Sequence, residues 1–287
     1  MTTRAATEQV IPPESLTRGP SDGASVRRAR RAGAAHPDAD VDIPRLFRRL
    51  RRDVSGEVRF DDSARHLYAE DASNYRHVPL GVVVPRHVDD VLLTLAACRE
   101  ANAPVVSRTG GTALAGQAAN EAVVVDFSKY MDHILELDPE ARRARVEPGV
   151  VCDRLVEAAR PHGLTWGPKP ATHDHCCFGG MIANNCGGMH AQYAGIAVHN
   201  VEALDVVLYD GTRLSLGWLT LQEWERRALG GGREGEIFAR LRELGMRHGE
   251  QIQRRFPRLP RRVSGYNLDE LLPGADGRVN LARALVG

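Results

Sequence analysis

Two glycine-rich segments carry the residues of this sequence that are best suited to chemistry. The first, SRTGGTALAGQAAN at residues 107–120, follows a short apolar run and holds the adjacent pair Gly110 and Gly111, and then Gly116. Glycine lets a ligand approach the backbone closely, so main-chain N–H groups and the Thr112 hydroxyl can donate hydrogen bonds to phosphate oxygens. The segment favours a phosphate site, although a glycine turn that only redirects the chain has the same composition.

The second segment, GPKPATHDHCCFGGMIANNCGG at residues 167–188, has the same character. A proline-rich extended lead precedes Gly179 and Gly180, which stand at the opening of a short apolar run, and a further glycine pair ends the segment. Paired glycines that open a short helix offer backbone N–H groups to an anion. Two such loops in one chain predict a long, bipartite ligand that contains a diphosphate.

Two common phosphate-binding motifs do not fit these segments. GTALAGQA has the glycine spacing of a mononucleotide P-loop, but Gln117 and Ala118 stand where that motif needs a lysine and a hydroxyl residue. GGTALAG also lacks the G-x-G-x-x-G spacing of a Rossmann fingerprint. An ATPase is therefore disfavoured, and so is an NADPH-dependent reductase.

The HDHCC stretch offers two alternative chemistries. His173 and His175 would share one face of a strand, and Cys176 and Cys177 follow directly, which suggests zinc ligands. Adjacent cysteines are poorly spaced for tetrahedral coordination, so we expect no metal ligand. A Cys177 nucleophile activated by His175 is also disfavoured, because neighbours along a chain seldom face each other. We expect no catalytic residue in this chain.

The elements that would position both segments alternate between strand and helix from Pro79 onward. Apolar runs predict strands at 81–85, 104–107 and 122–127, and the apolar spacing of 88–103 predicts a helix between the first two. Further elements are expected in three places: a hairpin within 134–150, a helix at 151–163, and a hairpin within 201–216 that turns at Asp210 and Gly211. The first glycine segment therefore begins where a strand ends.

The remaining chain divides into segments of different composition. We predict a disordered tail over 1–40, an N-terminal helix and lead-in over 41–77, a core over 78–217, and a helical extension over 218–287 interrupted by three glycines at 230–232. The tail contains RRARRAG, a stretch that would suit nucleic acid or anionic lipid if aromatic residues were interleaved with the arginines. None are, so a solvated leader is the preferred interpretation.

Composition excludes several classes of protein. The 287 residues are 43% hydrophobic and have a formal net charge of +1, so the chain is not a polycation for nucleic acid. Five cysteines are an odd number in a chain too large to need disulfides, which favours a reducing cytoplasm. No apolar run approaches the length of a membrane span.

Four motifs carry a resemblance to a known family. RTGGTALAGQ, VEPGVVCDRL, PKPATHDHCCFGGMIANNCGG and RRVSGYNLDELLPG resemble the N-terminal half of FAD-linked oxidases of the vanillyl-alcohol-oxidase type. More narrowly, they are similar to bacterial D-2-hydroxyacid dehydrogenases, of the D-lactate and 2-hydroxyglutarate type, in which this domain is fused to an iron-sulfur module. The resemblance covers roughly residues 50–287. It implies an α+β fold, a PCMH-type FAD-binding domain of two α+β subdomains, with FAD extended between them.

The resemblance also implies which residues hold the cofactor. The first segment would supply one pyrophosphate loop, the second would line the diphosphate and flavin side, and one residue of a later strand would lie near the adenine and ribose. Covalent members place a histidine after the paired glycines, where this chain has Thr112, so we expect FAD to be bound non-covalently. The predicted cofactor-binding residues are Arg108, Thr109, Gly110, Gly111, Thr112, Ala113, Gly116, Gln117, Thr172, Gly179, Gly180, Ala183, Asn184, Gly188 and Val201.

The sequence ends with NLARALVG at Gly287, where similar proteins continue with Ser-Glu-Gly-Thr and a substrate domain. We therefore expect a domain that is incomplete at its C-terminus, with Leu281, Leu285 and Val286 exposed unless another chain covers them. The activity implied is oxidation of a D-2-hydroxy acid to a 2-oxo acid, with substrate held only by the missing C-terminal domain.

The same resemblance implies partners for such a protein. An iron-sulfur module would accept the electrons, in the cytoplasm or peripherally at the inner membrane through an electron acceptor. Two other interpretations stay open: a flavin-binding subunit that works with a partner chain carrying the substrate domain, and a nonfunctional fragment.

Overall fold

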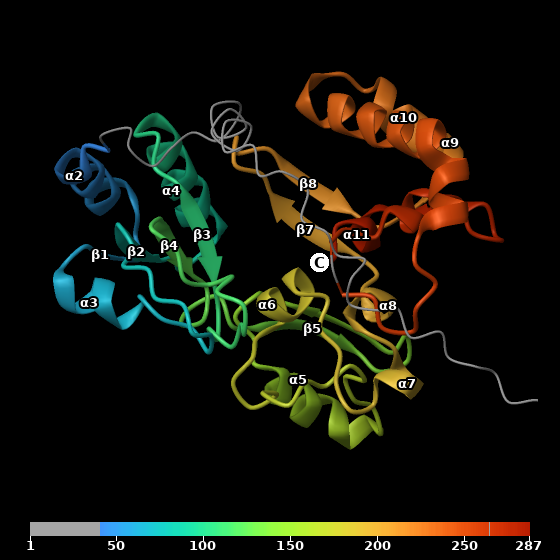
Figure 1. The fold of residues 1–287 in the computed structure, drawn as a ribbon, viewed down its shortest axis with the longest axis horizontal. Coiled ribbons are helices and arrows are strands. Elements are labelled where there is room, and N and C mark those ends of the chain that lie inside the picture. Colours follow the sequence, from blue (N-terminus) through green and yellow to red (C-terminus); the bar gives the residue numbers. More distant parts are fainter. Residues whose placement is uncertain (1–40, 264) are drawn as a thin grey trace, which may run out of the picture. The chain divides into compact units, whose positions relative to one another are not determined.

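The structure is a computed structural model that describes residues 41–263 and 265–287, so the predicted tail over 1–40 lies outside the described residues. Helices and strands are mixed along the chain, as the α+β prediction requires (Figure 1). Among the described helices, none combines the length and the apolar character that crossing a bilayer requires.

The first part of the fold is a four-stranded sheet. Its strands are β1 (Glu57–Arg59), β2 (Gly81–Val84), β3 (Val105–Arg108) and β4 (Val123–Asp126), in the order β1-β2-β4-β3. The three strands β2, β4 and β3 are parallel, and β1 is antiparallel to β2. Every residue of β2 and β4 is buried, which explains why both strands appear as continuous valine runs in the sequence.

Three helices belong to this part: α2 (Ile43–Asp53), α3 (Asp62–Leu67) and α4 (Val88–Glu100). The Asp42 side chain accepts a hydrogen bond from the Arg45 N–H and so caps α2. Leu46 and Leu50 of α2 are fully buried and pack with Val83 and Val123 of the sheet in one core cluster. Figure 1 shows α2 and α4 beside these strands.

The middle of the chain forms a hairpin and short helices. Its elements are β5 (Ile134–Asp138), β6 (Arg143–Val146), α5 (Cys152–Ala159), the 3-10 helix η2 (Arg160–His162) and α6 (Phe178–Ala183). Gly163 has φ +69° and ends η2, as expected for a glycine after a helix. A core cluster joins Cys152 and Leu155 of α5 to Phe178 and Met181 of α6. The second glycine segment, which contains α6, is therefore packed against α5.

The predicted hairpin at the end of the core is confirmed. After α7 (Ala191–Ala194) and α8 (Ala197–Asn200), strands β7 (Leu204–Val207) and β8 (Arg213–Leu216) pair antiparallel. Gly211 has φ +88°, and the Asp210 carboxylate accepts a hydrogen bond from the Thr212 N–H at 2.9 Å. The turn therefore falls on the predicted Asp-Gly pair.

The last part is less helical than predicted. It comprises β9 (Trp218–Thr220), α9 (Leu221–Leu229), α10 (Gly232–Arg255), the 3-10 helix η3 (Leu268–Leu271), β10 (Arg278–Asn280) and α11 (Leu281–Ala284). The predicted interruption of the helical region at 230–232 is confirmed, but the region opens with a strand, which pairs antiparallel with β10.

The expectation of an exposed C-terminal tail is wrong. Leu281 and Val286 are fully buried in a core cluster with Trp224 and Phe238, and Leu285 is partly buried against the same cluster. The buried Asn267 explains how the end is held, because its side-chain amide donates hydrogen bonds to the carbonyls of Arg283 and Val286. These apolar residues are covered by this chain itself.

Candidate functional site

The first glycine segment begins at the carboxyl end of β3. Arg108 is opposite Asp126 of β4, so the segment leaves the sheet where two parallel strands end. Gly111 and Gly116 have φ +64° and +79°, values that side chains disfavour and glycine adopts freely. The chain here forms bends and turns without regular structure, as the sequence predicted.

Backbone N–H groups of this segment are free to bind a ligand. Within the described residues, the N–H groups of Gly111, Thr112 and Ala113 donate no hydrogen bond to the protein, whereas the Gly111 carbonyl accepts one from the Ala72 N–H. The Gln117 side chain turns back to accept from the Ala115 N–H. Three successive unpaired donors at a glycine turn are a suitable cradle for anionic oxygens.

The structure brings the two glycine segments into direct contact. A β-carbon on Gly110 would lie 2.3 Å from the His175 carbonyl oxygen, so the backbones touch. On the same side, the Thr109 side chain lies against the start of α6: its Oγ1 is 3.0 Å from a β-carbon position on Gly180, and its Cγ2 is 3.3 Å from that of Gly179. Four residues that were predicted separately from two segments, Thr109, Gly110, Gly179 and Gly180, thus lie at one contact between the loops.

The Cys177 side chain lies between the two segments and contacts both. It is buried at the residue before α6, and its thiol meets the Gly110 N–H and the Thr109 hydroxyl. Burial raises the pKa of the Cys177 thiol to about 11, and those two donors lower it only in part. The thiol therefore stays protonated near neutral pH and acts as packing between the loops.

The second segment is tightly packed at its glycine pair. A β-carbon on Gly188 would overlap the Lys169 carbonyl oxygen, at 1.6 Å, so only glycine allows the segment to close on its own proline-rich lead. The Asn184 side chain donates to the Gly180 carbonyl at 3.0 Å and ends α6. The next residue, Asn185, is buried and adopts φ +46°. Close backbone approach is thus a property of both segments.

The Arg108 side chain contacts several parts of the first segment and its surroundings. Its guanidinium stacks over the Tyr68 ring at 5.4 Å from the ring centroid and donates to the Ala118 carbonyl at 3.3 Å. It also lies 2.6 Å from the position of a β-carbon on Gly111. The positive charge of Arg108 is therefore close to the free N–H groups. Gly111 has φ +64° and no side chain, and both properties allow the guanidinium to lie this close to the backbone.

The HDHCC stretch does not adopt the geometry assumed for a zinc site. Residues 171–175 form turns instead of a strand, so the two histidines do not share a strand face. His173 Nδ1 is 2.6 Å from an Asp153 carboxylate oxygen, whereas exposed His175 contacts Asp174. Among the described residues there is no group of three or more His, Cys, Asp or Glu side chains arranged to hold a metal.

Three further predicted site residues are not among the pairs that join the two loops. The Thr172 carbonyl accepts hydrogen bonds from the His175 and Cys176 N–H groups and so shapes the turn before α6. Ala183 is exposed at the end of α6. Val201 follows α8, three residues before β7 begins, and is buried in the core cluster of the last part, where its carbonyl accepts from Arg283 Nε. Their cofactor role stays a prediction.

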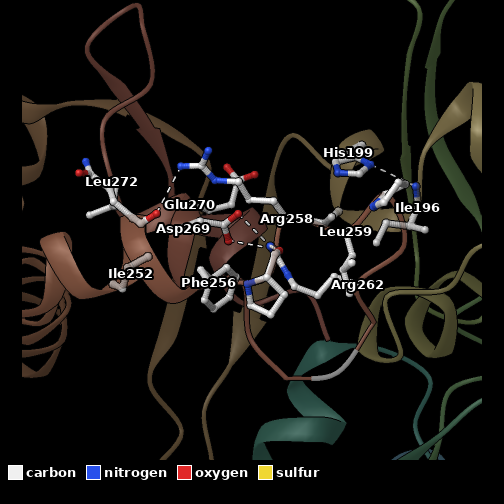
Figure 2. A pocket seen from close by; sticks show the side chains of 14 residues that line it. Ile196, His199, Ile252, Phe256, Arg258, Leu259, Arg262, Asp269, Glu270 and Leu272 are labelled. Atoms are coloured by element: carbon white, nitrogen blue, oxygen red, sulfur yellow. Dashed lines mark hydrogen bonds and ion pairs between the residues drawn. The ribbon is translucent and has the colours of Figure 1, made fainter. Parts of the chain in front are cut away.

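A cavity that is partly open to solvent lies elsewhere, at the end of α10. It has a volume of about 370 Å³ and includes none of the predicted site residues. Figure 2 shows His199 and Arg258 at this cavity, together with the ion pair between Arg262 and Asp269. The residues of the first glycine segment are instead exposed or half-buried, apart from the buried Ala119.

Comparison with known proteins identifies the part of the chain that carries both loops. Residues 79–217 match the model of a family described as FAD binding domain. Residues 79–217 therefore have the sequence pattern of an FAD binding domain, and we call them the FAD domain. The FAD domain includes every predicted cofactor-binding residue, and its cofactor is FAD.

Curated relatives extend the similarity of the FAD domain beyond its own ends. The D-2-hydroxyglutarate dehydrogenase of Pseudomonas putida is 34% identical over 251 residues, which are 86% of this chain and 25% of that protein. Glycolate oxidase subunit GlcD of Escherichia coli is 37% identical over 182 residues, 62% of this chain and 36% of that protein. A D-lactate dehydrogenase of Archaeoglobus fulgidus is 34% identical over 170 residues, 58% of this chain and 37% of that protein. The chain spans between a quarter and somewhat more than a third of the length of these relatives.

Solved structures support the same fold for the FAD domain. An alkyldihydroxyacetonephosphate synthase superimposes with a TM-score of 0.53 at 18% identity, covering 61% of this chain and 38% of that one. The 6-hydroxy-D-nicotine oxidase of Arthrobacter nicotinovorans gives 0.51 at 24% identity, covering 57% and 36%. The predicted fold, a PCMH-type α+β domain, is therefore confirmed.

The residues of the FAD domain suit this cofactor. The unpaired N–H groups of Gly111, Thr112 and Ala113 are available to donate to diphosphate oxygens, and the glycines leave room for a flat ligand to approach the backbone. Sequence reasoning missed Cys177 as the residue that joins the loops. Its position directly before the Phe178–Gly179–Gly180 run was the available signal, but the sequence could not show that Thr109 comes to meet it.

Proposed function

We propose that this chain supplies the FAD-holding part of a flavin-dependent oxidoreductase that oxidises a D-2-hydroxy acid to the 2-oxo acid. The observation that carries the proposal is the contact of Thr109 and Gly110 with Gly180 and His175, because it unites two glycine segments into one surface rich in backbone donors. The names of the relatives, which include dehydrogenases for D-2-hydroxyglutarate and D-lactate, support the substrate class.

Each residue of the surface has a definite task in this proposal. The N–H groups of Gly111, Thr112 and Ala113 would hold the diphosphate oxygens, with Arg108 adding positive charge close to them. Bound FAD supplies the chemistry by accepting a hydride from the carbon that bears the substrate hydroxyl. We assign no catalytic base to this chain.

We further propose that FAD is bound without a covalent bond. Thr112 stands at the position where the resemblance implies a histidine in covalent members. Burial raises the pKa of Cys177 to about 11, so this thiol is not a ready nucleophile. A hydrogen bond with Cys152 lowers the pKa of Cys176, but the Cys176 side chain is buried and so is shielded from a ligand at the surface. A flavin released intact by heat or acid is the expected behaviour.

Catalysis would need residues beyond the FAD domain. Because the chain spans only a quarter to somewhat more than a third of the relatives, we propose that a substrate-binding domain completes the site and that an iron-sulfur module accepts the electrons. The name of one relative, a glycolate oxidase subunit, favours a second candidate: a flavin-binding subunit that acts with a partner chain. The proposed organisation is a lead-in over 41–77, an FAD core over 78–217, and an extension over 218–287.

The test is uptake and reduction of FAD by the purified chain. After incubation with FAD and desalting, a retained flavin absorbance band is expected, and Gly110→Val should abolish it because the larger side chain separates the loops. D-2-hydroxyglutarate added without air should leave this flavin oxidised if the substrate domain is required. A folded chain that retains no flavin would overturn the proposal, whereas bleaching by the chain alone would overturn the need for a partner.

A further inference from the structure

The loop between α10 and η3 lies against the second glycine segment. The side-chain amide of Asn185 donates to the Arg262 carbonyl at 3.2 Å, and its Oδ1 accepts from the Val198 N–H at 3.0 Å. Because Asn185 is fully buried, both hydrogen bonds are shielded from water. The backbone around Arg262 is therefore fixed next to the glycine pair at 187–188.

Arg261 is the residue that this arrangement brings to the glycines. Its Nε is 3.7 Å from the position of a β-carbon on Gly187, and its charge lowers the pKa of the neighbouring Cys186 thiol, although burial raises that pKa overall. The side chain is exposed, and within residues 41–263 and 265–287 it makes neither a hydrogen bond nor an ion pair. It is an unneutralised cation at the edge of the second segment.

Other cations near this segment are already engaged. Lys169 is 2.8 Å from an Asp153 carboxylate oxygen. Arg262 is 2.8 Å from Asp269 and also donates to the Asn267 side chain, as Figure 2 shows for the Asp269 pair. Arg261 therefore differs from its neighbours in having its charge available for a ligand.

An FAD diphosphate carries negative charge that the first segment meets mainly with neutral N–H groups. A free guanidinium at the opposite segment would complement that charge, since charge-assisted hydrogen bonds to phosphate are stronger than neutral ones. We propose that Arg261 is a cofactor-binding residue whose guanidinium pairs with the FAD diphosphate beside Gly187. This inference rests on the proposed role of both segments as the FAD site.

The experiment compares FAD with riboflavin, which has the flavin ring and no phosphate. Dissociation constants are measured by flavin fluorescence for the wild-type chain, Arg261→Ala and Arg261→Lys at low and high salt. Arg261→Ala should weaken FAD binding about fivefold to tenfold at low salt, and the difference should shrink to about twofold or less near 0.5 M salt. Arg261→Lys should keep most of the affinity, and riboflavin binding should not change.

Arg258→Ala is the matched control, because it removes the same charge three residues before Arg261. The Arg258 side chain donates to the Gln253 carbonyl. The FAD affinity of this variant should stay within about twofold of wild type. If Arg261→Ala weakened FAD and riboflavin binding equally, or if both alanine variants lost FAD affinity equally, the proposed role of Arg261 would be wrong. The proposed function of the chain would be unaffected by either result. A wild-type chain that binds no FAD would instead overturn the proposed function, and this inference with it.

Discussion

Gly110 is in backbone contact with His175, sixty-five positions further along the sequence, and a β-carbon on Gly110 would lie 2.3 Å from the His175 carbonyl oxygen. Moving either residue would disturb regular structure, because Gly110 follows strand β3 and His175 belongs to the turn that leads into α6. The two glycine segments are therefore held together by shape, and the predictions below start from that contact.

Gly110→Ala should weaken both the fold and FAD binding. A methyl group cannot fit 2.3 Å from a backbone oxygen, so the loops must separate, at a cost of roughly 1 to 3 kcal/mol in the free energy of unfolding. Chemical denaturation and flavin fluorescence measure the two effects. The control is Gly249→Ala in α10, where the new methyl meets a Leu272 side-chain carbon at an ordinary 3.4 Å. Equal behaviour of the two variants would mean that the contact does not constrain the loops.

Stability should fall as the pH is lowered from about 4.5 towards 2, and Glu57 should account for part of this loss. Hydrogen bonds from Lys129, Tyr130 and Arg59 lower the pKa of Glu57 to about 2, so the unfolded chain binds a proton in this range while the folded chain does not. The associated stability is fully present above the unfolded pKa and is lost on acidification.

Glu57→Gln tests this prediction. The variant should have a shallower dependence of the unfolding free energy on pH between 4.5 and 2, with a difference of roughly 1 to 2 kcal/mol across the range after allowance for solvent screening. The exposed Glu140 makes no ion pair within the described residues, so Glu140→Gln is a matched control and should leave the slope unchanged. An identical slope in all three proteins would refute the role of Glu57.

Asn267→Ala should release the C-terminal end. The amide of this fully buried side chain donates to the Val286 carbonyl at 2.6 Å and to the Arg283 carbonyl at 3.2 Å, and its loss leaves two carbonyls without those donors. We expect a loss of about 1 to 3 kcal/mol and faster amide hydrogen exchange in residues 278–287. Asn120→Ala at an exposed position should do neither. Unchanged exchange would show that the core cluster alone holds the end.

The cysteines should react slowly in the folded chain. Burial raises the pKa of Cys98 and Cys186 to about 12 and that of Cys177 to about 11, so roughly one Cys177 thiol in a thousand is ionised at pH 8. Labelling with a thiol reagent, followed by peptide mass spectrometry, should find these three residues protected in buffer and modified in guanidinium. Rapid labelling of Cys177 in the folded chain would revive a nucleophilic role for it.

The sequence by itself determined the elements and the class of site. Valine runs at 81–84 and 123–126 had to be buried strands, because such continuous apolar runs cannot face water, and Asp210–Gly211 had to be a turn. The glycines of both loops, with the family motifs around them, were sufficient to predict a PCMH-type FAD domain. These features depend on local conformation and composition, which neighbouring residues set.

Only the tertiary structure decided which of these residues meet. That Thr109 lies against Gly180, that Cys177 joins the loops, and that Arg261 reaches Gly187 all depend on contacts between segments far apart in the sequence. The end of the chain is the clearest example. The sequence predicted that Leu281 and Val286 would be exposed, yet both are buried in a core cluster. Pairing of β9 with β10 and the hydrogen bond from Asn267 to Val286 hold this end of the chain in place. Burial is a property of the assembled fold, so the local sequence could not reveal it.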